Sequence, residues 1–242
     1  MQIKLSFSSE KDIILPIHYN NLIQAFIYNN IDKRLAAFLH EYGYISNGRS
    51  FKLFSFSNIL CKGKKEEQSF SFGKKIEFVV ASPLEYFCKS IANYMLQRDI
   101  LYLGQNYIKT EQMQVINKKI EKDEIVIKTL SPIVAYSTLI RPDGRKYTCY
   151  FRPEESDFSR IITENLVKKY NVLSNDNLVA YDWISFTPVG RARQNLVYYK
   201  DTVIKGATGK FIVKGDKKLL QVGIDTGFGS KNSQGFGCVE IV

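Results

Sequence analysis

Two kinds of hydrophobic pattern open the chain. Polar and apolar residues alternate over Gln2–Phe7, and this period of two predicts a half-buried strand. The apolar residues of Leu22–Ile27 have the spacing of one helix face instead. A second helix is expected after Asp32, whose side chain suits an N-cap, and Gly43 stands where a C-terminal cap belongs. The pattern therefore predicts a strand followed by two helices.

Strands and helices continue to alternate as far as residue 120. Ser69–Phe72 and Ile76–Ala81 are predicted to form a hairpin that turns near Gly73, and Ser82 is expected to cap the helix Pro83–Gln97. This order of elements is that of a ferredoxin-like β-α-β-β-α-β unit. The other predicted strands of this half are Phe51–Phe56, Ile100–Leu103 and Met113–Ile120.

The second half follows the same order of elements without repeating the sequence. Leu139–Tyr150 is predicted to be a hairpin because it contains a Pro-Asp-Gly turn signal at 142–144. The strands Trp183–Thr187 and Leu196–Lys205 are expected to flank a basic turn, Val189–Gln194. The other predicted elements are the strands Ile125–Thr129 and Phe211–Val213 and the helices Glu154–Tyr170 and Leu219–Ile224. Both halves therefore have the elements of a ferredoxin-like unit.

Together these patterns predict an α+β protein with two tandem ferredoxin-like (RRM-like) domains. We expect the domains to be 1–121 and 122–242, with the boundary in the charged stretch Asn117–Glu124. A chain of 242 residues is long enough for two domains of modest size.

Charge and cysteine usage narrow the class of function. The 34 Lys and Arg residues outnumber the 24 acidic residues, and the net charge of +10 points to a polyanionic partner, either nucleic acid or an anionic membrane surface. No apolar run is long enough to span a bilayer, and the first residues lack the apolar centre of a signal peptide. The four cysteines are far apart, which argues against disulfides and structural zinc. We expect a reduced, cytoplasmic protein.

The last sixteen residues, 227–242, hold the most distinctive motif. We call residues 227–237 the glycine segment, and a predicted strand follows it. The polar centre of the segment, Lys231, Asn232 and Ser233, and its backbone N–H groups suit a phosphate, while a tight turn between elements is the alternative interpretation. The residues after Gly237 have the pattern of a strand, so the segment is neither a dinucleotide-binding nor a Walker motif. The glycines of its two Gly-Phe-Gly triplets are Gly227, Gly229, Gly235 and Gly237.

The candidates for proton transfer lie in the first half. The chain has two histidines, His18 and His40, and the second has Tyr28 before it and Lys52 after it. On one unbroken helix Tyr28 and His40 would be about 18 Å apart, at 1.5 Å per residue. The break at Asn29 and Asn30 allows the chain to reverse, so that the two side chains can share a site. Taken singly, each of the three is better explained as an ordinary surface or core residue.

These segments together resemble a known family. The surroundings of Tyr28, His40 and Lys52, the sequence Leu130–Ile133 and the segment from Val222 to Val239 resemble the CRISPR-associated endoribonucleases of the RAMP superfamily, which cut precursor CRISPR RNA within its repeats. The resemblance implies two ferredoxin-like domains with RNA along a basic face or cleft. It also implies cleavage without metal or other cofactor, leaving a 5′-hydroxyl and a 2′,3′-cyclic phosphate.

The resemblance further implies that Tyr28, His40 and Lys52 are catalytic, and their chemistry fits. Histidine titrates near neutral pH, so His40 suits a general base, while Tyr28 suits an acid or an orienting hydroxyl. Lys52 would stabilise the extra negative charge on phosphorus. The dipole at the end of the helix favours a protonated His40, so the roles of acid and base can be exchanged. His18 is a weaker candidate, with packing as its alternative.

RNA binding requires phosphate contacts, which basic residues supply. The resemblance favours the glycine segment and the segment with Arg191 and Arg193 as RNA-binding, and Arg141, Arg145 and Lys146 on the predicted hairpin are further candidates. The expected partners are repeat RNA within precursor CRISPR RNA and subunits of a CRISPR interference complex, with no membrane, and the chain as a monomer or homodimer. The alternative function is a non-catalytic RAMP protein that binds repeat RNA or forms part of an effector complex.

Overall fold

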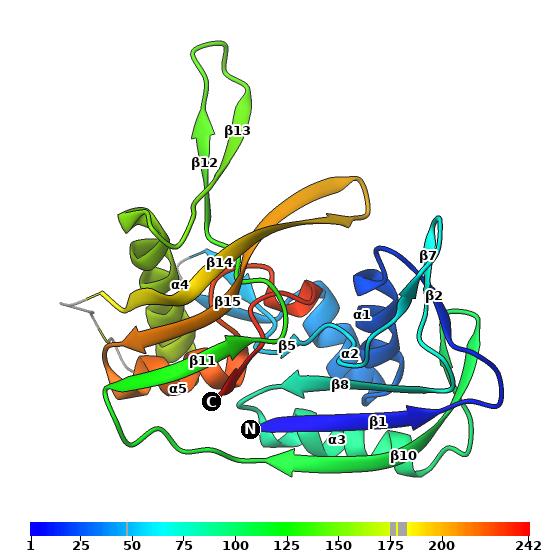
Figure 1. The fold of residues 1–242 in the computed structure, drawn as a ribbon. Coiled ribbons are helices and arrows are strands. Elements are labelled where there is room, and N and C mark those ends of the chain that lie inside the picture. The colour runs from blue at the N-terminus through cyan, green and yellow to red at the C-terminus, as the bar shows by residue number, and fades with distance from the viewer. Residues whose placement is uncertain (47, 175–177, 179–182) are drawn as a thin grey trace.

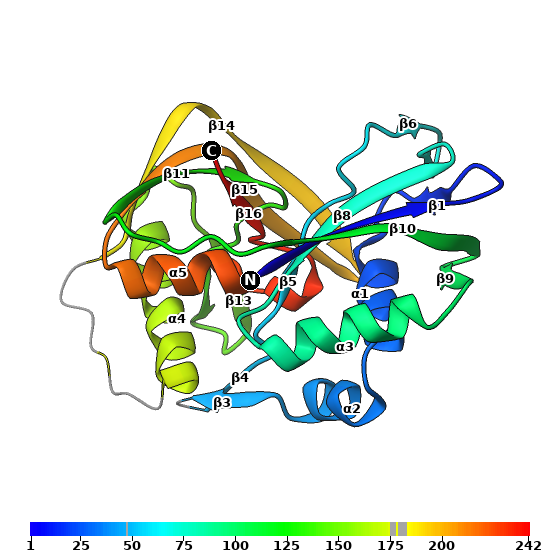
Figure 2. The same ribbon diagram turned by 90° about the horizontal axis from the view of Figure 1, so that it is seen from below.

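The first half of the protein is a five-stranded antiparallel sheet with helices on one face (Figures 1 and 2). The computed structural model describes residues 1–46, 48–174, 178 and 183–242. The strand order is β5-β8-β1-β10-β9. These strands are β1 (Gln2–Ser8), β5 (Ser55–Phe56), β8 (Lys75–Ala81), β9 (Leu101–Leu103) and β10 (Asn106–Ile116), and the helices of this half are α1 (Asn20–Asn29), α2 (Lys33–Glu41) and α3 (Glu85–Leu96).

The alternation in β1 explains how this half is packed. Ile3, Leu5 and Phe7 are buried in one core together with α1 and α3 residues such as Phe26 and Phe87. Across the sheet, β5, β8, β1 and β10 are the second, third, first and fourth of these four strands in chain order. Helices lie between the first two strands of the chain (β1 and β5) and between the last two (β8 and β10). This is the ferredoxin-like arrangement, so that prediction is confirmed for the first half.

The second half has the same topology. Its sheet has the order β14-β15-β11-β16, and α4 and α5 pack against it through a second core that contains Phe158, Leu166, Phe211 and Leu219. The elements are β11 (Glu124–Thr129), α4 (Ser156–Ser174), β14 (Ser185–Tyr199), β15 (Thr202–Lys214), α5 (Lys217–Thr226), a short 3-10 helix η1 (Asn232–Gln234) and β16 (Val239–Ile241). The α+β fold with two tandem ferredoxin-like units is therefore confirmed.

The boundary between residues 121 and 122 stays a prediction. It lies in the connection between β10 and β11, where Ile120 packs into the second core and its N–H donates to Gln221 Oε1 at 2.9 Å.

The predicted caps of α2, the helix that carries His40, are confirmed. The Asp32 side chain accepts hydrogen bonds from the N–H groups of Arg34 and Leu35 at 2.9 and 3.0 Å and so caps α2. At the other end, Gly43 has φ +67° and its N–H donates to Phe38 O at 2.8 Å. These two caps set where α2 begins and ends, and His40 lies in its last turn.

Two strand predictions in the first half are wrong in their partners or extent. Phe51–Phe56 is not one strand, because Leu53 has φ +54° and separates β4 (Arg49–Phe51) from β5. The strands predicted near 69–72 and 76–81 do not pair with each other. β7 (Ser69–Ser71) pairs with β2 (Ile14–Pro16) and β6 (Lys64–Lys65), whereas β8 joins the main sheet. Alternation identifies strands but not their neighbours.

The helix that follows β8 begins two residues later than predicted. Its first residue is Glu85, and its N-terminal boundary residue, Leu84, makes no side-chain cap. Ser82 Oγ accepts from Leu84 N–H at 3.2 Å and donates to Leu53 O at 2.8 Å, so this hydroxyl ties the helix start to the Leu53 turn.

The largest error concerns the basic segment of the second half. Val189–Gln194 was expected to be a turn, but it lies inside the single long strand β14, as an irregularity in its register with β15 between Val189 and Arg193. The true turn is at Lys200 and Asp201, between Tyr199 and Thr202. The β14–β15 ribbon therefore extends past the sheet and reaches towards α1 of the first half (Figure 1).

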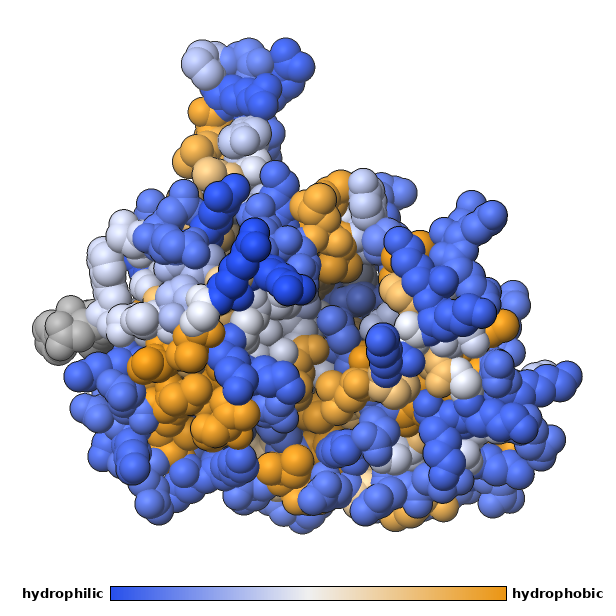
Figure 3. Space-filling model, viewed as in Figure 1, coloured by the Kyte–Doolittle hydropathy of each residue, from blue (hydrophilic) through white to orange (hydrophobic). Residues whose placement is uncertain are grey.

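The hairpin predicted over 139–150 is confirmed and projects from the molecule. Its strands are β12 (Tyr136–Ile140) and β13 (Lys146–Tyr150), and they form a sheet of their own (Figure 1). A second small sheet pairs β3 (Tyr44–Ser46) with β4. The tip of the projecting hairpin is hydrophilic, with apolar side chains below it (Figure 3).

Candidate active site

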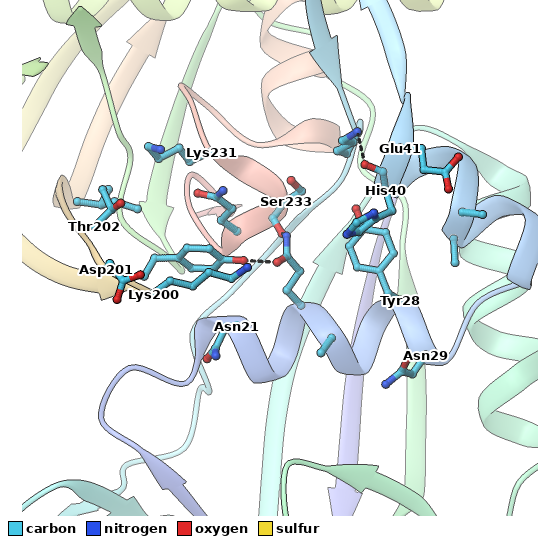
Figure 4. A pocket seen from close by; sticks show the side chains of 18 residues that line it. Asn21, Tyr28, Asn29, His40, Glu41, Lys200, Asp201, Thr202, Lys231 and Ser233 are labelled. Atoms are coloured by element: carbon cyan, nitrogen blue, oxygen red, sulfur yellow. Dashed lines mark hydrogen bonds between the residues drawn. The ribbon is translucent and has the colours of Figure 1, made fainter. Parts of the chain in front are cut away.

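A hollow of about 950 Å³ lies between the two halves and gathers the proposed catalytic residues. Tyr28 comes from α1, His40 from the end of α2, and Lys52 from the connection between β4 and β5. Lys231 and Ser233 line the hollow from the glycine segment, across from His40 (Figure 4). Residues that are far apart in the sequence therefore share one concave surface.

The reversal between α1 and α2 brings Tyr28 and His40 together. Their ring centroids are 6.1 Å apart and the rings are nearly perpendicular, at 80°. Tyr28 is half-buried against Phe54, with ring centroids 5.8 Å apart, whereas His40 is exposed at the C-terminal end of α2. The phenol is therefore held by packing, and the imidazole is open to a bound molecule.

Lys52 completes the group. Its Nζ donates to the backbone oxygen of His40 at 3.3 Å, which ties the lysine to the end of α2 (Figure 4). Burial lowers the pKa of Lys52 from its ordinary value. Burial, with a smaller effect from Tyr199, raises the pKa of Tyr28 to about 12. Tyr28 is therefore protonated and neutral at physiological pH.

Two further residues of the hollow were missed from the sequence. Gln24 lies one helical turn before Tyr28 on α1, and its Nε2 donates to Ser233 O at 2.6 Å. Its Oε1 accepts from the hydroxyl of Tyr199, at the end of β14 (Figure 4). Gln24 thus joins α1, the β14–β15 turn and the glycine segment. The sequence signal for Gln24 was its position four residues before Tyr28 on the same helix. The position of Tyr199 depends on where the β14–β15 ribbon turns, and the sequence did not predict that turn.

The glycine segment is tightly packed, and its backbone is used differently from what was expected. Its four glycines all have positive φ, and a Cβ at Gly237 would lie 2.0 Å from Phe228 O. Many of its N–H groups bond within the protein, including those of Ser230, which donates to Val134 O, and Gly237, which donates to Pro132 O. These N–H groups stabilise the segment and are not presented to a ligand.

The side chains of the polar centre are divided between structure and surface. Asn232 Nδ2 donates to Phe228 O and Phe236 O at 3.2 and 3.1 Å, so this amide holds the segment together. Lys231 lies over the ring of Tyr136, with its Nζ 5.4 Å from the ring centroid, and burial lowers its pKa. Lys231 and Ser233 are thus the members of the centre that reach the hollow.

A second hollow of about 560 Å³ adjoins the first and shares Lys52, Lys231 and Ser233 with it. Its other walls include Arg49, from β4, and Tyr136, from β12. The shared residues make one continuous cleft along the junction of the two halves. A chain longer than a single nucleotide therefore has room on both sides of Lys52.

The other predicted basic residues lie away from this cleft. Arg141, Arg145 and Lys146 are exposed at the tip of the β12–β13 hairpin. Arg191 and Arg193 are on β14, and of the two Arg193 lines a small separate hollow of about 180 Å³. None of the five is among the described residues that line the two cleft hollows.

The weaker candidate, His18, is not among the residues that line the hollow with Tyr28, His40 and Lys52. Its ring packs on Tyr198, with centroids 4.8 Å apart, and its Nδ1 accepts from Tyr198 N–H at 3.4 Å. This contact joins the start of α1 to the β14–β15 ribbon.

Within the described residues, no group of three or more His, Cys, Asp or Glu side chains is placed to hold a metal ion. None of the helices in the described part of the chain combines the length and apolar character needed to cross a bilayer.

Solved structures share the fold over the whole chain. A structure described as CRISPR associated protein Cas6 superposes with a TM-score of 0.80 and 25% identity, covering 100% of this chain and 99% of the other. A second, described as the characterization of a Cas6-related gene from Pyrococcus furiosus, has a TM-score of 0.84 with 20% identity and covers 100% and 98%. The second likeness is evidence for the fold alone.

Sequence comparisons give the family. A curated relative from Methanocaldococcus jannaschii, named CRISPR-associated endoribonuclease Cas6 1, is 26% identical over 99% of this chain and 92% of its own length. One from Pyrococcus furiosus, named CRISPR-associated endoribonuclease Cas6, is 25% identical over 96% of this chain and 86% of its own. Residues 113–241, slightly more than half of the chain, match the family model for the C-terminal part of CRISPR associated protein Cas6. The chain therefore belongs to the CRISPR-associated Cas6 family.

Proposed function

We propose that this protein is an endoribonuclease that cuts CRISPR repeat RNA within its precursor to produce mature guide RNA. The observation that carries the proposal is the meeting of Tyr28, His40 and Lys52 in one open cleft, with the rings of Tyr28 and His40 6.1 Å apart. A protein that only bound RNA would have no need of a proton acceptor, a proton donor and a cation at one point. The names of its relatives agree with this activity.

The reaction is an internal transesterification. His40 removes the proton of a ribose 2′-hydroxyl, and the 2′-oxygen forms a bond to phosphorus. The bond from phosphorus to the 5′-oxygen breaks, and Tyr28 donates its proton to that oxygen. The products are a 2′,3′-cyclic phosphate and a 5′-hydroxyl. A proton then passes from His40 back to Tyr28, directly or through water, which restores both groups.

The raised pKa of Tyr28 supports this assignment of roles. A phenol with a pKa of about 12 is a poor base at neutral pH but can protonate a leaving alkoxide, which is far more basic. Lys52 places a cation beside the phosphorane, where preorganised charge contributes strongly to catalysis. Acid, base and cation are all side chains, so the proposed reaction requires no bound metal ion.

RNA is proposed to follow the cleft and the basic residues around it. Lys231 and Ser233 contact the backbone beside the scissile phosphate, and Arg49 and Tyr136 line the continuation of the cleft. Phosphate contacts fix the register of the strand, and an aromatic face such as that of Tyr136 can stack on an unpaired base. Arg141, Arg145, Lys146, Arg191 and Arg193 are proposed to bind more distant parts of the repeat.

The test is cleavage of the cognate repeat RNA in EDTA by wild type, His40→Ala and His18→Ala. The two variants are matched, because each removes one of the two histidines. We expect one cut with a cyclic phosphate from wild type and His18→Ala. His40→Ala should lose roughly 100-fold or more in rate while still binding RNA, as expected for removal of a general base.

Each other outcome has a definite meaning. Equal cutting by wild type and His40→Ala would contradict the catalytic role of His40. Tight binding of the repeat with no cutting by any variant would replace the nuclease with the non-catalytic RNA-binding protein. Cleavage by wild type that stops in EDTA would contradict the metal-independent mechanism.

A further inference from the structure

Lys169 is a buried charged residue of the second half, at the base of the second cleft hollow. It is on α4 and only 2% exposed, yet its Nζ donates to Gly227 O at 2.8 Å, to Gly229 O at 3.4 Å and to Asn232 Oδ1 at 2.7 Å. No carboxylate forms an ion pair with it among the described residues. All three partners belong to the glycine segment.

This arrangement is costly, so stability alone gives no reason for it. Burial lowers the pKa of Lys169 to about 7, which reflects the cost of removing an ammonium group from water. An apolar side chain of similar length would avoid that cost. An ammonium group has three N–H donors, and here three oxygen acceptors converge on it. The match in number points to a specific task, namely to hold these oxygens.

The three oxygens that accept from Lys169 lie on both sides of Lys231, the residue of the glycine segment that lines the cleft. Gly227 and Gly229 precede Lys231, and Asn232 follows it directly. Lys231 itself has φ +62°, an uncommon conformation for a residue with a side chain. Asn232 then joins the two sides of the segment through Phe228 O and Phe236 O. Lys169 therefore anchors both ends of the short stretch that directs Lys231.

We propose that Lys169 is a positioning residue that acts through Lys231. It keeps the glycine segment in the one conformation in which the Lys231 ammonium lies between the two cleft hollows, ready for the RNA backbone. The RNA part of this proposal rests on the proposed function, whereas the ordering of the segment does not.

The first test measures order in the protein without RNA. Lys169→Met is compared with Lys168→Met, a half-buried neighbour on the same helix. By amide hydrogen exchange, we expect peptides covering 227–237 to exchange at least tenfold faster in Lys169→Met, with other peptides of the second half unchanged. Lys168→Met should exchange like wild type. Unchanged exchange of 227–237 in Lys169→Met would overturn the proposal.

The second test is a double-mutant cycle on kcat/KM for repeat RNA. We expect Lys231→Met and Lys169→Met each to lower kcat/KM about tenfold, and the double variant to stay within about threefold of either single one, because both remove the same contribution. A purely structural role of Lys169 would give losses that multiply to about 100-fold. Multiplying losses would therefore overturn the proposal.

The two proposals fail separately. If wild type binds repeat RNA without cutting it, the nuclease proposal is wrong. The double-mutant cycle is then measured on the dissociation constant for repeat RNA in place of kcat/KM. If Lys169→Met does not fold, Lys169→Gln takes both tests in its place, because it keeps a polar end group but removes the charge and the third N–H donor.

Discussion

Burial has opposite consequences for the two polar side chains that flank His40. It raises the pKa of Tyr28 to about 12 and lowers that of Lys52, because in each case a low-dielectric surrounding disfavours the charged form. For tyrosine the neutral form is the one that can donate a proton. Packing against Phe54 therefore fixes the place of Tyr28 and also suits it to the proposed role of acid.

Tyr28→Phe tests this role through its pH dependence. A donor with a pKa of about 12 is fully protonated between pH 6 and 9, and its contribution is lost only as the pH rises through 12. We expect Tyr28→Phe to lower the single-turnover rate roughly 100-fold or more, the usual size for general acid catalysis, by the same factor at every pH in this range. If Tyr28 acted as the base, its replacement would instead remove a rise in rate with pH.

Some site residues could be recognised from the sequence alone, and others could not. Lys169 falls on the buried face of α4, seven residues after Ile162 and three after Leu166, so a lysine in the apolar stripe was visible as an anomaly. Helical spacing alone could not say what it bonds. That required the glycine segment to fold back onto α4 from sixty residues away, which is a tertiary contact without a local signature.

At the scale of elements, the sequence correctly predicted several local structures. The Asp32 cap, the turn of the β12–β13 hairpin and the strand after the glycine segment were all predicted, because each depends on neighbouring residues. β14 was misread because Pro188 and Gly190 normally interrupt strands. Here Gly190 lies within the register irregularity between Val189 and Arg193, and Pro188 lies just before it on β14, an edge strand that tolerates proline.

The projecting hairpin allows a test of electrostatic binding by one element. Replacing Arg141, Arg145 and Lys146 by Gln removes three exposed charges from its tip. Each phosphate contact on single-stranded RNA contributes about 0.7 to the slope of log Kobs against log salt, so we expect the slope to fall by about 2. The measurement is a salt titration of repeat RNA binding by fluorescence anisotropy.

A matched control separates this local effect from net charge. Lys62, Lys64 and Lys65 are also exposed, and their replacement by Gln changes the net charge by the same amount. We expect the control to keep the wild-type slope. Equal slopes for the two triple variants would mean that the hairpin does not contact the RNA backbone.

In the whole molecule, the two halves are joined by buried side chains and not by the chain connection alone. Gln2 Nε2, at the start of β1, donates to Ile224 O and Val239 O at 3.2 and 2.8 Å. The Met1 ammonium group pairs with Asp225. On the other side of the junction, Asn20 and Gln24 bond the glycine segment. Since the cleft is lined by both halves, its shape depends on these contacts.

Asn20→Ala tests how strongly the halves are joined, with Asn21→Ala as its neighbour control. Asn20 is buried, and its Nδ2 donates to Gln234 O and Gly235 O at 3.0 and 3.2 Å, whereas Asn21 is exposed. Loss of a buried donor leaves these carbonyls unsatisfied, so we expect Asn20→Ala to lower the free energy of unfolding by about 1–3 kcal/mol. For Asn21→Ala we expect a change within about 0.5 kcal/mol. Urea unfolding followed by circular dichroism measures both, and equal stabilities of the two variants would show that the Asn20 contacts contribute nothing to the junction.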